Sequence, residues 1–149
     1  MSIHFKIATP ERVLLDTTAE SLTLPTEMGE ITVLANHIPL VANLVAGEIK
    51  YKYQGKTDFF AVSGGVIEVR KGDEVVVLAD TAEFGHEIDL KRAEEARDRA
   101  KKLMDEKVSD PKIFQDAAAA FGRNLARIRV AHKHRTHTSK NLESGTLHE

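Results

Sequence analysis

The chain has 149 residues, of which 42% are hydrophobic and 30% charged, and its formal net charge at pH 7 is −2. This composition supplies a core and a charged surface, and the length fits one domain or one small domain with an appendage. The absence of cysteine excludes a disulfide framework and thiolate metal sites. Residues 1–10 contain no apolar stretch of the signal-peptide kind, and no apolar run approaches the ~20 residues that cross a bilayer. We therefore expect any membrane role to act through a partner.

The first half of the chain alternates apolar and polar residues, the pattern of strands with one buried and one exposed face. Ile3, Phe5 and Ile7 occupy alternate positions near the start, and the segment 48–55 follows the same rule. Because many short strands follow one another with no helical period before Asp80, we expect an antiparallel β-sandwich over 1–84. Turn signals separate the expected strands at Thr9-Pro10, Met28-Gly29, Gly55-Lys56, Gly64-Gly65 and Gly72-Asp73.

The second half changes to a helical period. Between 89 and 107 the apolar positions recur three or four residues apart, which predicts an amphipathic helix. A second stripe follows Asp110-Pro111, and an Asp-Pro pair is a strong helix start signal. The short link predicts an antiparallel two-helix hairpin over 85–135. The two stripes consist of Ala93, Ala96, Ala100 and Leu103, then Phe114, Ala118, Phe121, Leu125 and Ile128.

The last part of the chain is basic and then loses its period. No Asp or Glu occurs in 117–142, so this part of the chain favours an acidic partner or ligand. The segment 136–149 lacks apolar content and period, and we expect it to be a disordered tail. The basic residues of 117–142 are Arg123, Arg127, Arg129, Lys133, Arg135 and Lys140.

Three stretches resemble a known family in order and spacing: 29–44, 60–83 and 87–93. They are similar to the epsilon subunit of bacterial F-type, proton-translocating ATP synthases, and the likeness covers roughly 3–135. The middle stretch is the most specific, with an aromatic-rich strand, Ser63-Gly64-Gly65, and a Val-rich strand that ends at Ala79-Asp80. The resemblance implies the same fold as the two periods, an amino-terminal β-sandwich followed by a helical hairpin.

The resemblance also implies a role. The family's sandwich sits at the foot of the central stalk, against the gamma subunit and the membrane ring of c subunits. Its hairpin either folds on the sandwich or extends toward the catalytic beta subunit, where it inhibits ATP hydrolysis. We therefore expect a non-catalytic rotor subunit at the cytoplasmic face of the bacterial inner membrane, held there only through the complex. No cofactor is expected to be required, and ATP is expected as a regulatory ligand, as in some members of the family.

A nucleotide site is implied by the segment 88–93, which matches the family's nucleotide-contacting pattern Ile/Leu-Asp-x-x-Arg-Ala. Guanidinium groups pair well with phosphate oxygens, and folding the hairpin would bring the arginines of both helices together. Glu83 would then reach the adenine or ribose side. The residues expected at this site are Glu83, Ile88, Asp89, Arg92, Ala93, Arg99, Arg123 and Arg127.

A structural interpretation of the same residues stays open. Asp89 is suited to cap the first helix, and a cap stabilises by ~1 kcal/mol. The arginines of that helix have Glu94, Glu95 and Asp98 as neighbours and would then form a solvated face. Because no Gly-rich phosphate loop occurs, any nucleotide site would be a sensor and not an NTPase.

Other polar residues suggest partner contacts. The resemblance places the loop of Glu30 and His37 near the stalk base and the membrane ring, and the turn at Asn36 is expected to be left-handed. On the second helix, Arg129, Lys133 and Arg135 would face an acidic loop of the catalytic subunit. No groove-reading module accompanies the basic residues, so nucleic acid is not expected as a partner.

Two other functions compete with that of a rotor subunit. A stand-alone nucleotide-sensing module would keep the ligand site but have no rotary partner. An enzyme is disfavoured because no catalytic set emerges from the serines, histidines and carboxylates. The histidines in 132–137 match no defined metal spacing, so we expect no metal site there.

Overall fold

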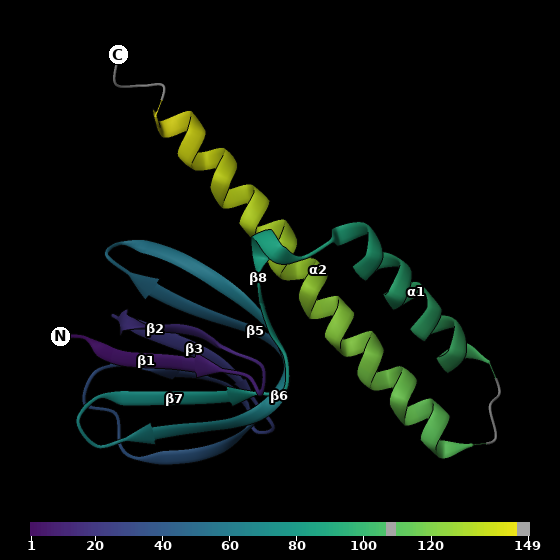
Figure 1. The fold of residues 1–149 in the computed structure, drawn as a ribbon, viewed down its shortest axis with the longest axis horizontal. Helices are drawn as coiled ribbons and strands as arrows, with labels where there is room; N and C mark the ends of the chain where they lie inside the picture. Colours follow the sequence, from purple (N-terminus) through teal and green to yellow (C-terminus); the bar gives the residue numbers. More distant parts are fainter. Residues whose placement is uncertain (107–109, 146–149) are drawn as a thin grey trace.

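The computed structural model contains an eight-stranded sheet folded into two layers, with a helical hairpin beside it (Figure 1). It describes the backbone of 1–106 and 110–145 and the side chains of 1–106 and 110–136. A short 3-10 turn, η1 (Gly85–Glu87), joins the sheet to the helices α1 (Leu90–Asp105) and α2 (Pro111–Gly145). The strands are β1 (Ile3–Ala8), β2 (Val13–Ala19), β3 (Ser21–Thr26), β4 (Gly29–Val33), β5 (Leu40–Tyr53), β6 (Lys56–Arg70), β7 (Glu74–Ala79) and β8 (Ala82–Phe84).

The sheet has the order β2-β1-β7-β6-β5-β3-β4, and β8 pairs with β6. The expected antiparallel pairing holds except between β1 and β7, which run parallel with His4 opposite Glu74. These two strands are far apart in the chain, so no hairpin turn forces them to be antiparallel. The long strands β5 and β6 take part in both layers, which makes the sandwich one continuous folded sheet.

Strand β6 bends where it passes from one layer to the other. Gly64 and Gly65 have φ values of +128° and +139°, a region that side chains rarely adopt. A Cβ on Gly65 would lie 2.0 Å from the carbonyl oxygen of Leu78 on β7. The Gly-Gly pair therefore supplies both the bend and the close approach of the neighbouring strand.

The core of the sandwich follows the predicted alternation. Ile3, Phe5 and Ile7 are at most 1% exposed, whereas His4 on the opposite face is open to solvent. Phe60 of β6 lies in the same cluster, which draws on both layers and ends at β8. Since its members lie within residues 3–84, the sandwich has a core of its own.

Both helices start where the sequence predicted. Asp89 caps α1, because its side chain accepts a hydrogen bond from the backbone N–H of Arg92 at 3.1 Å. Asp110 accepts one from the backbone N–H of Lys112 at 2.9 Å, immediately before α2. Figure 1 shows the two helices antiparallel, with α2 between α1 and the sandwich, so the hairpin is in its folded position.

Two expectations about α2 need correction. The predicted apolar stripe is only partly right: Ile128 is buried and the three positions before it are half-buried, but Phe114 is 45% exposed, and Ala117 and Val130, outside the stripe, are buried. The reason is that the second half of α2 contacts both α1 and the sandwich, so no single stripe describes its buried face. The expected disordered tail is also wrong for 136–145, because α2 runs to Gly145. Once a helix has formed, each further residue adds one backbone hydrogen bond, which favours its continuation. Residues 146–149 lie outside the described part.

Candidate functional site

A small apolar cluster fixes the hairpin on the sandwich. Phe59 and Ala61 of β6 meet Ile88 and Ala93, together with a buried segment of α2. Ala93 is 0% exposed and Ile88 is 9% exposed. These two members of the predicted nucleotide pattern are therefore packing residues in the folded hairpin, and they position the polar residues around them. The α2 segment consists of Ile128, Val130 and Ala131.

Strand β8 places Glu83 toward the hairpin. In the β6–β8 pair, Ala61 lies opposite Glu83 and Phe60 lies opposite Phe84. Successive side chains of a strand point to opposite faces, so Glu83 and Ala61 face α2, whereas Phe60 and Phe84 pack together in the core with ring centroids 4.6 Å apart.

Glu83 is met by Arg127 of α2. The Arg127 Nε donates to Glu83 Oε2 at 2.7 Å and its Nη2 donates to Oε1 at 3.3 Å, and Nη1 donates to Asn124 Oδ1 at 3.1 Å. Asn124 is 7% exposed and donates from Nδ2 to the carbonyl oxygen of Ala120 at 2.8 Å. The Arg127 guanidinium is thus hydrogen-bonded both to β8 and to its own helix, α2.

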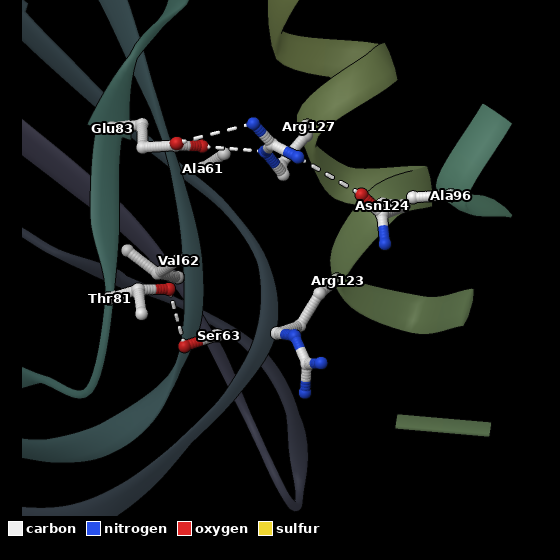
Figure 2. Close-up of a pocket in the computed structure, with 9 residues that line it drawn as sticks. All are labelled: Ala61, Val62, Ser63, Thr81, Glu83, Ala96, Arg123, Asn124 and Arg127. Atoms are coloured by element: carbon white, nitrogen blue, oxygen red, sulfur yellow. Dashed lines mark hydrogen bonds and ion pairs between the residues drawn. The ribbon is translucent and has the colours of Figure 1, made fainter. Parts of the chain in front are cut away.

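A cavity of about 380 Å³ opens beside this ion pair, between β6 and α2 (Figure 2). On the sandwich side, Thr81 donates a hydrogen bond from its hydroxyl to that of Ser63 at 2.6 Å. On the hairpin side, Arg123 lies below Arg127, and its guanidinium points away from Glu83 (Figure 2). Among the described side chains, Arg123 has no ion pair. The remaining lining comes from Ala61, Val62, Ala96 and Asn124.

A second cavity of about 440 Å³ adjoins the first, since Glu83, Ala96 and Arg127 line both. It lies toward the start of α1, where Arg92 and Arg99 reach it from the exposed side of the helix. Four carboxylates line this cavity together with three guanidinium groups, and two of the carboxylates, Glu83 and Glu87, are ion-paired with Arg127 and Arg12. The rest of the lining comes from Glu87, Asp89 and Glu95.

The two cavities bring together six of the eight residues predicted for a nucleotide site. Glu83, Asp89, Arg92, Arg99, Arg123 and Arg127 line them, whereas Ile88 and Ala93 support them from the apolar cluster. An arrangement of exposed guanidinium groups from two helices, next to hydroxyls and small apolar side chains, suits an anion attached to a larger group. Ser63, Thr81 and Asn124 also line the first cavity, but no local sequence signal marks them because their positions matter only after the hairpin docks.

The residues predicted for partner contacts are spread over the molecule. Glu30 is exposed, and the loop of His37 follows Asn36, whose φ of +64° is the predicted left-handed turn. Arg129 is exposed on α2. Lys133, in contrast, forms an ion pair with Glu48 of β5 and so faces an acidic residue of its own chain.

The remaining partner-contact residue, Arg135, is exposed on α2. Within the described residues, no group of three His, Cys, Asp or Glu side chains could hold a metal ion. In the same part of the chain, no helix has the length and apolar character needed to span a membrane.

Comparison with known proteins decides the family. The family model for the β-sandwich domain of the ATP synthase delta/epsilon chain matches residues 2–85, and the model for its long α-helix domain matches 86–132. The chain belongs to the ATP synthase epsilon chain family. It is 40% identical to the ATP synthase epsilon chain of Nitratidesulfovibrio vulgaris over 87% of this chain and 95% of that one. The epsilon chain of Dehalococcoides mccartyi is also 40% identical, over 91% and 96%.

This epsilon chain also shares its fold with a solved structure. A chain in the Euglena gracilis mitochondrial ATP synthase matches 81% of it with a TM-score of 0.73 at 24% identity, and 76% of that chain is covered. The two matched family domains meet at 85–86, next to the predicted boundary between sandwich and hairpin. As an epsilon chain, the protein is a subunit of ATP synthase and not itself catalytic.

Proposed function

We propose that this epsilon chain is a rotor subunit that couples proton-driven rotation to ATP synthesis. Its hairpin inhibits ATP hydrolysis when it extends, and ATP stabilises the folded hairpin. The observation that carries the proposal is the joint cavity at Glu83, where Arg92 and Arg99 of α1 meet Arg123 and Arg127 of α2 against the sandwich. Residues of the sandwich and of both helices line these cavities together in the folded position, so a bound triphosphate would favour that position.

The partners follow from the family. The sandwich contacts the gamma subunit and the c ring, with Glu30 and His37 on the ring side, and the extended hairpin contacts the catalytic beta subunit. The family's domain models and the naming of its relatives as ATP synthase epsilon chains support this assignment. The chain would then lie at the cytoplasmic face of a bacterial plasma membrane through its complex alone.

Regulation takes the form of a population shift between the two hairpin positions. A ligand that binds one of two conformations changes their balance by its differential binding free energy. ATP at a hundred times its dissociation constant adds about 2.7 kcal/mol to the folded hairpin. That amount is enough to reverse a balance of a few kcal/mol, so cellular ATP would hold the hairpin down and its depletion would release the inhibitory form.

The first test is isothermal titration of the isolated full chain with ATP. Arg92→Ala and Arg123→Ala each remove one cation of the cavities, and we expect both to weaken saturable binding. Arg97→Ala is the matched control, because Arg97 is on the same helix as Arg92, pairs with Asp98 and lines neither cavity. No binding at millimolar ATP would refute the ligand, and equal weakening by all three variants would refute the site.

A second test separates the roles of the two domains. Truncation after Glu87 removes both helices but keeps the core of the sandwich. We expect the truncated chain to assemble with the other ATP synthase subunits and to release control of ATP hydrolysis. Loss of assembly would contradict the division of roles. Failure of the full chain to co-purify with those subunits would favour a stand-alone nucleotide-sensing module.

A further inference from the structure

The second half of α2 is held on the sandwich by contacts outside the two cavities. We propose that Gly85 and the Lys133–Glu48 ion pair over Phe59 form a latch, which sets how readily the hairpin leaves the sandwich when no nucleotide is bound. The latch rests on the proposed function, since it presupposes a hairpin that moves. It adds a ligand-independent control of the folded position.

Lys133 contacts two groups of the sandwich. Its ammonium group donates a hydrogen bond to Glu48 Oε1 of β5 and lies 4.8 Å from the centroid of the Phe59 ring on β6. A cation over an aromatic face is attracted by the ring, and more so when water is partly excluded. The Lys133 and Glu48 side chains are 41% and 25% exposed, so both are partly removed from water. The contact therefore joins α2 to two strands at once.

The second carboxylate oxygen of Glu48 explains why the docked helix needs the charge of Lys133. Glu48 Oε2 is buried and has no hydrogen-bond partner among the described residues. A dehydrated carboxylate is costly unless a nearby cation compensates it, and here Lys133 supplies the compensation. Without that charge, movement of α2 away from β5 would return water to the buried oxygen of Glu48. Removal of the Lys133 charge is thus expected to favour the undocked hairpin specifically.

Gly85 sets how close α2 comes to the sandwich. A Cβ added to Gly85 would lie 2.5 Å from the Cβ of His134 and 3.2 Å from the carbonyl oxygen of Val130. Neither atom is the far end of a flexible side chain, so relief of the clash requires movement of α2 or η1. The neighbouring His86 and His134 rings lie 5.9 Å apart, which places η1 directly against the helix. The glycine is therefore required for this docked position.

The latch and the nucleotide site are separate. Gly85, Glu48 and Lys133 line neither cavity. A weaker latch lowers the fraction of chains that present the assembled cavities, and apparent ATP affinity falls by the same fraction. The latch residues therefore tune ATP affinity without contact with the ligand.

Amide hydrogen exchange of the isolated full chain, without nucleotide, tests the latch. In Lys133→Met, which keeps the length of the side chain and removes its charge, we expect α2 amides to exchange about tenfold faster. Gly85→Ala is expected to have the same effect, while amides of β6 keep their protection in both variants. The controls are Lys112→Met, an exposed lysine of the same helix, and Gly122→Ala, where an added Cβ meets nothing within 4 Å.

The outcomes separate the latch from the moving hairpin. Faster exchange of α2 in Lys133→Met and Gly85→Ala, but not in the controls, supports the latch. The charge reversal Lys133→Glu should be rescued by Glu48→Lys in the same chain. Equal α2 exchange in Lys133→Met and Lys112→Met overturns the latch alone. If α2 of the unmodified chain exchanges no faster than the core of β6, the hairpin does not leave independently, and both the latch and the proposed movement fail.

Discussion

Arg127 on α2 holds Glu83 on β8 through two hydrogen bonds, from Nε to Oε2 at 2.7 Å and from Nη2 to Oε1 at 3.3 Å. Paired bonds of this kind fix direction as well as distance, so the Arg127 guanidinium contributes to the angle at which the hairpin meets the sandwich. Arg127 therefore has a structural partner before any ligand arrives. Arg123, one turn earlier, lines the same cavity without an ion pair among the described residues.

This difference predicts that the two arginines contribute differently to stability. Without ATP, Arg127→Met should lower the free energy of unfolding by about 1 kcal/mol, because the pair is partly shielded from water. Arg123→Met should change it by less than about 0.5 kcal/mol. Urea unfolding of the nucleotide-free chain measures both values. Equal losses for the two variants would show that the Glu83 pair does not hold the hairpin.

Two substitutions of Asp89 distinguish its role as a helix cap from a role of its negative charge. Asp89→Ala removes the acceptor for the backbone N–H of Arg92 and should cost about 1 kcal/mol of stability. Asp89→Asn keeps an acceptor oxygen and should cost much less, because Asn caps nearly as well as Asp. Thermal unfolding of the two variants gives the comparison. An ATP titration of Asp89→Asn then reports the charge alone, so unchanged binding would mean that Asp89 acts only as a cap.

Gly122 lies inside α2, and an added Cβ there would meet nothing within 4 Å. Gly122→Ala should stabilise the chain by about 1 kcal/mol, because Ala has the higher helix propensity. The melting temperature should rise by about 3 °C for a chain of this size. Gly65→Ala provides the contrast and should be strongly destabilising, since its Cβ would lie 2.0 Å from the Leu78 carbonyl oxygen. A lower melting temperature for Gly122→Ala would indicate that α2 needs flexibility at this point.

The surroundings of Tyr51 predict that the folded chain loses stability at alkaline pH. Burial first, and then the nearby Asp58 carboxylate, raise the pKa of Tyr51 above its ordinary value of 10.0. The folded chain thus keeps the phenol proton at pH values where the unfolded chain loses it. The stability from the neutral phenol is fully present below the unfolded pKa and is lost as pH rises through the folded pKa.

The measurement is the free energy of unfolding between pH 8 and about pH 11, compared for the unmodified chain, Tyr51→Phe and Tyr53→Phe. The steepest fall is expected for the two chains that retain Tyr51. Tyr53 is 37% exposed and serves as the control. Parallel curves for all three chains would show that Tyr51 does not contribute to the alkaline loss.

The sequence predicted those features that depend on neighbours in the chain. The alternation at Ile3, Phe5 and Ile7 identified the buried face of β1, and the capping residues Asp89 and Asp110 located the two helix starts. Each of these signals acts within a few residues, through side-chain direction in a strand or a hydrogen bond to the first helical turn. The family pattern at 88–93 is also contiguous, and two of its residues, Asp89 and Arg92, line the second cavity.

Only the tertiary structure decided which residues face one another. Three contacts join segments that are far apart in the chain: the parallel pairing of β1 with β7, the ion pair of Arg127 with Glu83 and the ion pair of Lys133 with Glu48. The sequence contained these charges but could not show that Lys133 pairs with its own sandwich in the folded hairpin. Its periodicity located Ile128 on the buried face of α2 but missed Ala117 and Val130, because a helix that packs on two surfaces buries more than one stripe. Long-range contacts depend on how layers and helices close on each other, and no local pattern encodes that geometry.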